Sequence, residues 1–425
     1  MRERITIRDF AGIKSVDLDL RRINILIGPQ ATGKSICAKM LYFFKGFTSQ
    51  LFTSLENQDE ESKRGFDLSI LRKFEEYFPP QSWPDSPFAA RYEIGDLFVE
   101  VSRAEDKKKI RLSYSEEFTR QRKLAQQNLG NVIEAMHGEE KDYDRRRAIY
   151  RARQDFYKSI DARVGEVATF NQLFIPAGRS FFANLQSSIF SFLSGNKAID
   201  PFLIEFGSVY ESIKEYPEHF IHQAVDDLEL EKKLDSLVAK ILCGKHVRER
   251  GRDYLVLPDG RQTAIANSSS GQQEMLPLAV VLRVFPFVRF SGWGHSIYIE
   301  EPEAHLFPTA QRHIVELMAA VFTSARLPLQ FIITTHSPYI LTAFNNLLEA
   351  GRLNSTLTKA KVKRLREIVP PEQMLKAEEF RAYSLNEGKA QSICCDETGL
   401  IATNVIDDVS EALSVQFDSL LEIEE

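Results

Sequence analysis

Alternating apolar and polar residues at the start of the chain predict strands. Apolar residues recur at about every second position in residues 4–10 and 16–20, which is the pattern of strands with one buried face. The run at 23–27 is almost wholly apolar, as in a strand that is buried on both faces. Gly28 ends this run, and the residues after Lys34 predict a helix. The first part of the chain is therefore expected to form strands, a loop and a helix.

The middle of the chain is predicted to be mainly helical. Short strands are expected at 88–94 and 97–103, and a charged helical stretch with narrow apolar stripes follows at 116–163. A second helical region extends to about residue 245. A hairpin then follows, because Pro, Asp and Gly at 258–260 separate two short apolar runs.

Helices and strands alternate in the last recognisable part of the chain. A helix from Gly271, a strand at 296–299, a helix at 308–324 and a strand at 330–334 are typical of a parallel α/β sheet. The predicted fold class is α/β, with a mixed sheet and a helical insertion. The expected division is into an N-terminal part, the helical insertion and a C-terminal part, at 1–105, 106–245 and 246–425.

The loop after the third strand carries a phosphate-binding motif. Its sequence, Gly-Pro-Gln-Ala-Thr-Gly-Lys-Ser, fits G-x-x-x-x-G-K-[ST] and stands between a predicted strand and a predicted helix. Backbone N–H groups of such a loop bind phosphates together with the helix N-terminus. The lysine would contact the β- and γ-phosphates of ATP, and the serine hydroxyl would bind Mg²⁺. The residues expected to bind the nucleotide are Gly28, Gln30, Ala31, Thr32, Gly33, Lys34, Ser35 and Ile36.

Two carboxylates follow the strand at 296–299. Glu300 and Glu301 begin the sequence Glu-Glu-Pro-Glu at the carboxyl end of this strand, where parallel sheets bind their ligands. One carboxylate there can hold Mg²⁺ through its water shell, and the other can polarise the attacking water. We assign Glu300 to the metal and Glu301 to the water. Without a phosphate loop, such acids would be ordinary turn or helix N-terminal residues.

His336 ends the next apolar strand, within Thr-His-Ser. A single histidine is most often structural, but one at a strand end beside a phosphate site can contact the γ-phosphate. We therefore predict a catalytic role for His336, together with Lys34 and Glu301.

A loop rich in serine opens the helix that contains Gly271. Residues 267–273 are Asn-Ser-Ser-Ser-Gly-Gln-Gln, and hydroxyls at a helix N-terminus can form a second anion site. Taken alone, the loop could be an ordinary helix cap in which Glu274 helps as in a capping box. With the other motifs present, we predict that Ser270, Gly271 and Gln272 bind the nucleotide.

The four motifs occur in the order found in ABC-type ATPases, and the chain resembles that class. The class includes transporter motor domains, chromosome-maintenance and recombination-repair ATPases, and the overcoming-lysogenization-defect (OLD) proteins. The resemblance implies an ABC-type P-loop ATPase head in which Ser270 and Gly271 cap the γ-phosphate held by a second subunit. Two protomers would then enclose two nucleotides head to tail, as a dimer or within a higher oligomer.

The chain departs from the ABC pattern at three places. Its signature is Ser-Ser-Gly-Gln-Gln, Glu300 stands where aspartate is usual, and Gln30 stands where asparagine is common. The first two departures predict slow turnover. For the glutamine loop of the class, Gln172 and Gln186 are candidates, but the segment between them is preferred, and its Arg179 is expected to face the nucleotide.

Two further stretches resemble a particular group within this class. Glu-Glu-Pro-Glu-Ala-His-Leu-Phe-Pro and Thr-Thr-His-Ser-Pro are most similar to the ATPases of bacterial anti-phage systems related to OLD proteins, such as the Septu and PARIS ATPase subunits. This resemblance implies an ATPase subunit that controls a separately encoded effector, a nuclease or a toxin. The TOPRIM nuclease of OLD proteins is not expected here, because Asp407 and Asp408 alone do not make its metal site.

Two other functions stay open. A DNA-repair or chromosome-maintenance ATPase would clamp DNA with the helical insertion, but 116–163 is short for a long coiled coil. A scaffold that keeps ATP bound with little turnover is compatible with the altered signature and with Glu300.

Composition and charge narrow the picture. The 425 residues carry a formal net charge of −6, which argues against an overall basic nucleic-acid binder but leaves room for a local basic face. The arginines in 145–153 are flanked by aspartates, so a solvated helix face is favoured there. The four cysteines lack the spacing of a zinc site, and no apolar run is long enough for a membrane span. A cytoplasmic protein with reduced thiols and no membrane partner is expected.

Overall fold

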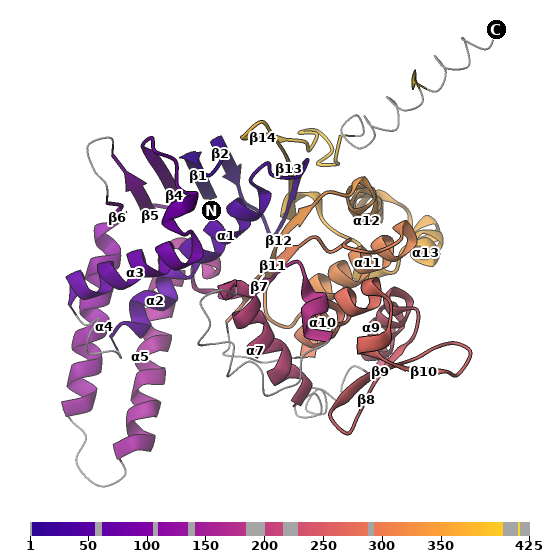
Figure 1. The fold of residues 1–425 in the computed structure, drawn as a ribbon, viewed down its shortest axis with the longest axis horizontal. Helices are drawn as coiled ribbons and strands as arrows, with labels where there is room; N and C mark the ends of the chain where they lie inside the picture. The colour runs from indigo at the N-terminus through magenta and orange to yellow at the C-terminus, as the bar shows by residue number, and fades with distance from the viewer. Residues whose placement is uncertain are drawn as a thin grey trace.

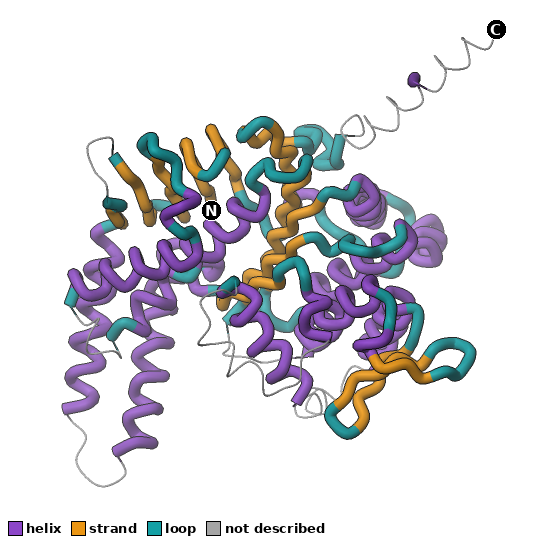
Figure 2. The backbone as a smooth tube through the Cα atoms, viewed as in Figure 1, coloured by secondary structure: helices purple, strands orange, loops and turns teal. Residues whose placement is uncertain are grey.

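One large mixed sheet runs through the described part of the molecule (Figures 1 and 2). The computed structural model describes residues 2–55, 62–104, 109–134, 141–183, 200–215, 228–287, 293–402 and 415–416. In chain order, the strands of this sheet are β1 (Glu3–Phe10), β2 (Ile13–Asp19), β3 (Ile23–Ile27), β4 (Phe88–Ile94), β5 (Leu97–Arg103), β6 (Arg111–Tyr114), β7 (Asn171–Ile175), β11 (His295–Glu300), β12 (Leu329–Thr335), β13 (Phe380–Asn386) and β14 (Lys389–Ser392).

The sheet has a parallel half and an antiparallel half. Its strand order is β6-β5-β4-β1-β2-β14-β13-β3-β12-β11-β7. From β13 to β7 every neighbouring pair is parallel, whereas from β6 to β2 every pair is antiparallel. All residues of β3, β11 and β12 are buried, as expected of parallel strands that are covered on both faces.

Helices lie on both sides of the main sheet (Figure 2). The described α-helices are α1 (Lys34–Lys45), α2 (Phe47–Thr53), α3 (Lys63–Tyr77), α4 (Glu116–Glu134), α5 (Lys141–Val164), α7 (Pro201–Glu215), α9 (Leu228–Leu242), α10 (Ser270–Val284), α11 (Pro308–Ser324), α12 (Pro338–Thr356) and α13 (Lys359–Ile368). Short 3₁₀ helices are η2 (Pro80–Ser82), η3 (Glu166–Thr169), η4 (Arg179–Ala183), η6 (Ile265–Asn267), η7 (Phe285–Phe287), η8 (Pro371–Gln373) and η9 (Ala377–Glu379).

The sheet separates two hydrophobic cores, because successive residues of a buried strand point to opposite faces. Ile25 and Ile297 belong to the core that contains residues of α10, α11 and α12. Leu26 and Tyr298 belong to the core that contains residues of α1 and α3. The strands that carry the predicted motifs are therefore held on both sides.

In the described residues, the range 106–245 of the predicted helical insertion contains α4, α5, α7 and α9. α4 and α5 lie side by side and extend away from the sheet (Figure 1). Arg146, Arg147 and Arg151 are exposed on α5, as favoured from the sequence, while the guanidinium of Arg153 lies 5.3 Å from the centroid of the Phe52 ring. The side chain of Arg145 is outside the described residues.

The predicted elements agree with the structure in most places. The fold class, α/β with a mixed sheet and a helical insertion, is confirmed, and β4, β5 and α11 have the predicted bounds. The predicted hairpin is present as β9 (Arg252–Val256) and β10 (Gln262–Ala264), to which β8 (Lys245–Glu249) adds a third strand. β6, β7, β8, β13 and β14 were not predicted from the sequence.

The three-part division of the chain stays a prediction. β6 and β7 both fall within 106–245, and both belong to the main sheet. Gln186, Asp407 and Asp408 lie outside the described residues. In the part of the chain that the structure describes, no helix is long and apolar enough to cross a membrane.

Candidate functional site

The loop at 28–35 closes around the amine of its own lysine. Lys34 begins α1 and is only 5% exposed, and its Nζ donates to the carbonyl oxygens of Gly28 at 2.8 Å and Pro29 at 2.7 Å. Burial lowers the pKa of Lys34, while the nearby carboxylates of Glu301 and Glu303 act to raise it. The amine is thus partly dehydrated and feels the charge of two carboxylates, while the ion pairs between described residues do not include it.

Two glycines of the loop are required by close contacts. A Cβ on Gly28 would lie 2.1 Å from the carbonyl oxygen of Leu385 on β13. Gly33 has a φ of +95°, and a Cβ there would lie 2.6 Å from the side chain of Ile13. The loop is therefore fixed against two neighbouring strands, while Gln30, Ala31 and Ser35 remain exposed.

The end of β11 carries the two predicted carboxylates in different settings. Glu300 is 7% exposed, and its Oε2 accepts from the backbone N–H of Ala177 at 3.4 Å. The side chain of Glu301 is 39% exposed, and its backbone has a left-handed φ of 45°. Because this conformation is unfavourable for a residue with a Cβ, it is expected mainly where the local structure requires it.

The predicted histidine joins the loop to the carboxylates. His336 follows β12, and its Nδ1 lies 3.4 Å from the Nζ of Lys34. Its Nε2 lies 3.3 Å from Oε1 of Glu301. The structure therefore brings together the three residues that were predicted to be catalytic.

Glu303 is a further member of this cluster that the sequence reasoning did not assign. Its Oε1 accepts from the backbone N–H of His336 at 2.6 Å, and burial raises the pKa of its carboxyl group. The available signal was the third acid in Glu-Glu-Pro-Glu, of which only the first two were given roles.

Several buried polar atoms at this edge have no hydrogen-bond partner in the described residues. These atoms are Oε1 of Glu300, Oε2 of Glu303 and Oγ1 of Thr334. Glu300 and Thr334 are paired across β11 and β12. Buried polar atoms are normally satisfied, so such a group indicates where a bound ion or water is expected.

The donor set at this edge suits Mg²⁺, which prefers oxygen ligands and keeps several waters. The Ser35 hydroxyl and the free oxygen of Glu300 are of this kind. Among the described residues there is no group of three or more histidine, cysteine or carboxylate side chains arranged to hold a metal. A site of one hydroxyl, one carboxylate and water does not need such a group.

Arg179 ties this edge to the signature helix and is not exposed toward a ligand. It is completely buried, and its guanidinium donates to the carbonyl oxygens of Glu300 at 2.7 Å and Glu301 at 3.1 Å. The backbone N–H groups of Arg179 and Ser180 donate to the carboxylate of Glu274 on α10 at 2.9 and 2.8 Å. This corrects the expectation that Arg179 faces the nucleotide, because its donors are used by the protein itself.

The signature loop forms a capping box, but with a different partner from the one expected. Ser269 caps α10 through the N–H of Gln272, and the Gln272 side chain accepts in return from the N–H of Ser269. The same side chain donates to the carbonyl oxygen of Leu242 at 2.7 Å. Glu274 takes no part in this cap, because it binds the Arg179 segment.

The two remaining signature residues differ in exposure. Ser270 is exposed at the N-terminus of α10. A Cβ on Gly271 would lie 2.6 Å from the carbonyl oxygen of His305, in the turn after β11. Binding of nucleotide by Ser270, Gly271 and Gln272 stays a prediction.

Gln172 lies at the wrong end of its strand for the nucleotide edge. It is paired with Ser296, near the start of β11, and its side chain contacts Tyr298 and the backbone of Phe170. The carboxyl edge of the parallel strands instead holds the loop at 28–35, Glu301 and His336, which follow β3, β11 and β12.

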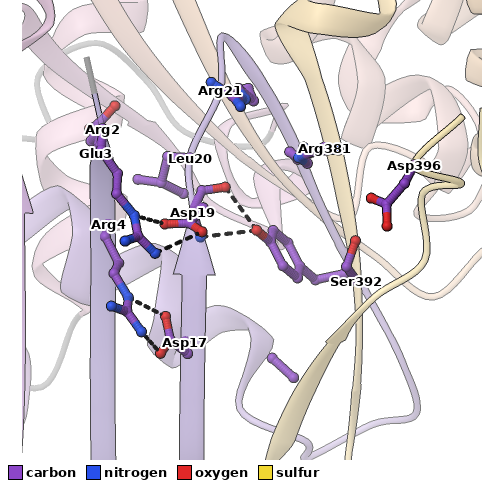
Figure 3. Close-up of a pocket in the computed structure, with 12 residues that line it drawn as sticks. Arg2, Glu3, Arg4, Asp17, Asp19, Leu20, Arg21, Arg381, Ser392 and Asp396 are labelled. Atoms are coloured by element: carbon purple, nitrogen blue, oxygen red, sulfur yellow. Dashed lines mark hydrogen bonds and ion pairs between the residues drawn. The ribbon is translucent and has the colours of Figure 1, made fainter. Parts of the chain in front are cut away.

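A polar cleft of about 700 Å³ opens at the opposite edge of the sheet (Figure 3). Its arginines are partly neutralised, since Arg2 pairs with Asp19 and Arg4 pairs with Asp17. The backbone of Asp19 also bonds to the hydroxyl of Tyr383. These ion pairs and hydrogen bonds connect β1, β2 and β13, and they occupy the polar groups of the cleft with partners from the protein itself. The candidate site therefore remains at the carboxyl edge of the parallel strands.

The comparisons with known proteins agree with an ATPase. Residues 169–341 match the family model of the AAA ATPase domain, a segment that contains Glu301 and His336 but not the loop at 28–35. A curated protein of Vibrio cholerae serotype O1 biovar El Tor, the Retron Vc95 probable ATPase, is 28% identical over 120 residues. This stretch is 27% of the present chain and 22% of that protein, so it covers about a fifth of the relative's length. The matched segment supports an ATPase domain of the AAA type, and nucleotide binding with it.

Two solved structures are similar to this chain at low sequence identity. One is described as the crystal structure of the SmcHead bound to the C-winged helix domain of ScpA, with 12% identity and a TM-score of 0.41 over 93% of this chain and 98% of that one. The other is the recombination mediator protein RecF-ATPrS in the RecFOR pathway, with 12% identity and a TM-score of 0.37 over 93% and 98%. At these TM-scores the likeness carries no conclusion about function.

Proposed function

We propose that this chain binds ATP with Mg²⁺ at the carboxyl edge of its parallel strands and hydrolyses it slowly. The observation that carries the proposal is the contact of His336 with both Lys34 and Glu301. These residues come from three separate segments, and each follows or begins an element whose position is fixed by buried strands. The match to the AAA ATPase domain supports the same activity independently.

Each residue of the cluster has a distinct proposed role. Lys34 exchanges the carbonyl oxygens of its own loop for phosphate oxygens, because charge-assisted bonds to phosphate are stronger than those to carbonyls. Glu301 accepts a proton from the attacking water, since its carboxylate is the more exposed of the two at the strand end. His336 holds Glu301 and contacts the γ-phosphate. The loop residues 28, 30–33 and 36 bind the nucleotide mainly through their backbone.

Ser35 and Glu300 are proposed to hold the Mg²⁺ ion. Bound there, the ion would neutralise charge on the β- and γ-phosphates. The chain's own contribution is to keep Glu300 in place, because Arg179 fixes the backbone of Glu300 and Ala177 holds one of its oxygens.

Completion of the site by a second protomer is part of the proposal. Ser270 and Gly271 would cap the γ-phosphate of the partner subunit, in a head-to-tail dimer or a higher oligomer. The exposure of Ser270 at a helix N-terminus supports this role, since such an end favours anions. In Ser270→Arg, ATP should still bind, but light scattering should no longer detect ATP-dependent association.

We further propose that the ATPase is a subunit of an anti-phage defence complex and controls a separately encoded effector, a nuclease or a toxin. The similarity of residues 300–308 and 334–338 to OLD-related defence ATPases supports this role, and so does the partial match to a protein named as a retron ATPase. The proposed three-part organisation would place the site in the outer two parts and leave 106–245 for partner contacts.

Glu301→Gln tests the catalytic core of the proposal. The variant should bind a fluorescent ATP analogue as tightly as the wild type, while ATP hydrolysis should fall by roughly 10²–10⁴-fold because a general base is removed. Glu316→Gln, on α11, is the matched control and should keep full hydrolysis. If turnover survives in Glu301→Gln, this residue does not activate the water. If the wild type binds ATP without measurable turnover, the chain is an ATP-locked scaffold.

A further inference from the structure

Helix α13 forms a strongly basic surface that the ATPase site does not use. Figure 1 places this helix at the outer edge of the molecule, beside α12. Five cations lie within its ten residues, all of them exposed: Lys359, Lys361, Lys363, Arg364 and Arg366. Among the ion pairs between described residues, none involves these five side chains.

The region around α13 is strongly basic within an acidic chain, as is the arginine cluster at 145–153. Residues 350–366 contain six Lys and Arg and no Asp or Glu, so the formal net charge of −6 would become −12 without them. An acidic chain that gathers cations in one stretch has a local field opposite to its overall charge. This is the local basic face that the composition alone could not exclude.

The charges in the first turn of α13 are arranged against the helix dipole. Lys359 and Lys361 lie in the first turn, which has no acidic residue, and the only acid of the helix, Glu367, lies near its C-terminus. Cations are favoured at the C-terminus and anions at the N-terminus, so Arg366 in the last turn is favourable, whereas the two lysines in the first turn are unfavourable. An external anion bound along the first turns would offset this cost.

Three of the cations form one stripe along the helix. Lys359, Lys363 and Arg366 are spaced i, i+4 and i+7, and therefore share one face over about 10 Å. The hydroxyls of Ser355 and Thr356 donate to backbone carbonyls of α12, but exposed Asn354 and Thr358, just before α13 in the chain, offer neutral hydrogen-bond donors. Such donors accompany lysine and arginine where proteins hold phosphate backbones.

The apolar side of α13 is already used for packing. Leu365 is buried and clusters with Ala350 and Met374, which leaves Ile368 as the large exposed apolar residue of the helix. A helix that binds a membrane surface needs a broad free apolar face next to its cations. α13 offers cations alone, so a hydrophilic polyanion fits this surface better than a lipid surface.

We propose that α13 binds the phosphate backbone of a nucleic acid, with little dependence on base sequence. The stripe of Lys359, Lys363 and Arg366 makes the central contacts, and Lys361 and Arg364 add to the attraction from the flanks. Backbone contacts of this kind give affinity that falls steeply with salt, because each one releases counterions. The surface is separate from the nucleotide edge and does not depend on ATP hydrolysis by this chain.

The experiment compares the full chain with two triple variants of equal charge. In Lys359→Gln/Lys363→Gln/Arg366→Gln the stripe is neutralised, and in Lys123→Gln/Lys232→Gln/Lys240→Gln three exposed lysines of α4 and α9 are neutralised instead. Fluorescence anisotropy with labelled single-stranded and duplex oligonucleotides measures binding at several salt concentrations. The stripe variant should bind about tenfold more weakly or worse, and its salt slope should fall by about three. The control should stay within about twofold of the wild type.

Four outcomes would overturn the proposal. The first is unchanged binding in the stripe variant, and the second is an equal loss in the control, which would show a general charge effect. The third is competition by polyglutamate as strong as that by unlabelled oligonucleotide, which would indicate an acidic protein partner. The fourth is α13-dependent binding to vesicles containing phosphatidylserine without binding to oligonucleotides. If the triple variant unfolds in circular dichroism, Lys359→Gln and Arg366→Gln are tested singly, and each should lower the salt slope by about one.

Discussion

Helix α1 has a buried lysine at each end, and the two lysines meet different kinds of partner. Lys45, at the C-terminal end, contacts the Glu3 carboxylate, which also accepts from Tyr92 and from Gln330, both at 2.8 Å. Lys34, at the N-terminal end, donates to two carbonyl oxygens of its own loop and lies beside an imidazole. We call the C-terminal end of α1 the closed end, because Lys45 forms an ion pair with Glu3 inside the protein. We call the N-terminal end the open end, because the hydrogen-bond partners of Lys34 are neutral groups.

The two edges of the sheet differ in the same way. Both oxygens of Glu3 are hydrogen-bonded, so the amino edge is satisfied by the protein alone. At the carboxyl edge, Glu300, Glu303 and Thr334 each bury a polar atom without a partner among the described residues. Since unsatisfied burial costs stability, it is expected to persist where a ligand completes the contacts. We therefore interpret the network around Glu3 as structural and the network around Glu300 and Glu303 as functional.

The largest expected effect tests the open end of α1. Lys34→Ala should lower ATP hydrolysis by roughly 10²–10³-fold, because a preorganised cation beside the transferred phosphate is lost. Thermal stability should change less than in a variant that breaks a buried ion pair, since none of the ion pairs between described residues involves Lys34. Lys39→Ala, in the same helix, is the control and should keep hydrolysis. Hydrolysis above a tenth of the wild-type rate in Lys34→Ala would contradict the assignment of this lysine.

The closed end of α1 should show the opposite result. Lys45→Met should lower the free energy of unfolding by about 3 kcal/mol, because the carboxylate of Glu3 would be buried without its cation. Urea unfolding measures this loss, and adding Glu3→Gln should restore part of it. If Lys45→Met instead leaves stability intact and abolishes hydrolysis, the contrast between the two ends is wrong.

The residues of the candidate site could be predicted from the sequence where short continuous motifs mark them. The loop at 28–35 is a continuous motif, and Glu300, Glu301 and His336 directly follow apolar runs whose strand character is evident. Because neighbouring parallel strands end at one edge, the motif order alone implied that these residues meet. The contact of His336 with Lys34 and Glu301 follows that expectation.

The remaining parts depend on contacts between distant segments, which a single sequence does not reveal. Glu3 and Gln330 are hydrogen-bonded across most of the chain length, and β13 places Leu385 against Gly28 although no motif marks that strand. Arg179 could be selected as unusual, but the groups that it holds after β11 are backbone carbonyls, which leave no trace in residue types, and its countercharge Glu274 is 95 residues away in the chain. A buried arginine and a ligand-binding arginine therefore look alike before the fold is known.

The buried histidine at the amino end of β11 predicts how the stability of the protein depends on pH. This residue is His295, and burial lowers the pKa of its imidazole from 6.5 to about 4. The folded protein keeps this ring neutral while the unfolded chain binds a proton below pH 6.5, so stability is lost as the pH falls from 6.5 toward 4. The loss is about 1.4 kcal/mol per pH unit. His295→Phe, which keeps a ring against Phe285, should lose less stability between pH 7 and pH 5 in thermal unfolding. Equal losses in both proteins would show that His295 does not titrate as its burial implies.

Arg179 is a buried cation that connects Glu274 on α10 with the backbone after β11. Its substitution has the smallest expected effect on ATP hydrolysis. Its charge is balanced by Glu274, with Nη2 at 3.3 Å from Oε1, while its other donors fix the backbone after β11. Arg179→Lys keeps the charge but cannot reach both carbonyl oxygens, because only the guanidinium has a planar fork of donors. We expect kcat to fall about tenfold with KM unchanged, since the carboxylate of Glu301 would be displaced without any loss of phosphate contacts. Glu274→Gln should give a similar but weaker fall, because it removes the countercharge and keeps one acceptor. A rise in KM with kcat unchanged would mean that Arg179 acts on ATP binding. It would contradict our proposal that Lys34 contacts the phosphates while Arg179 only positions the backbone after β11.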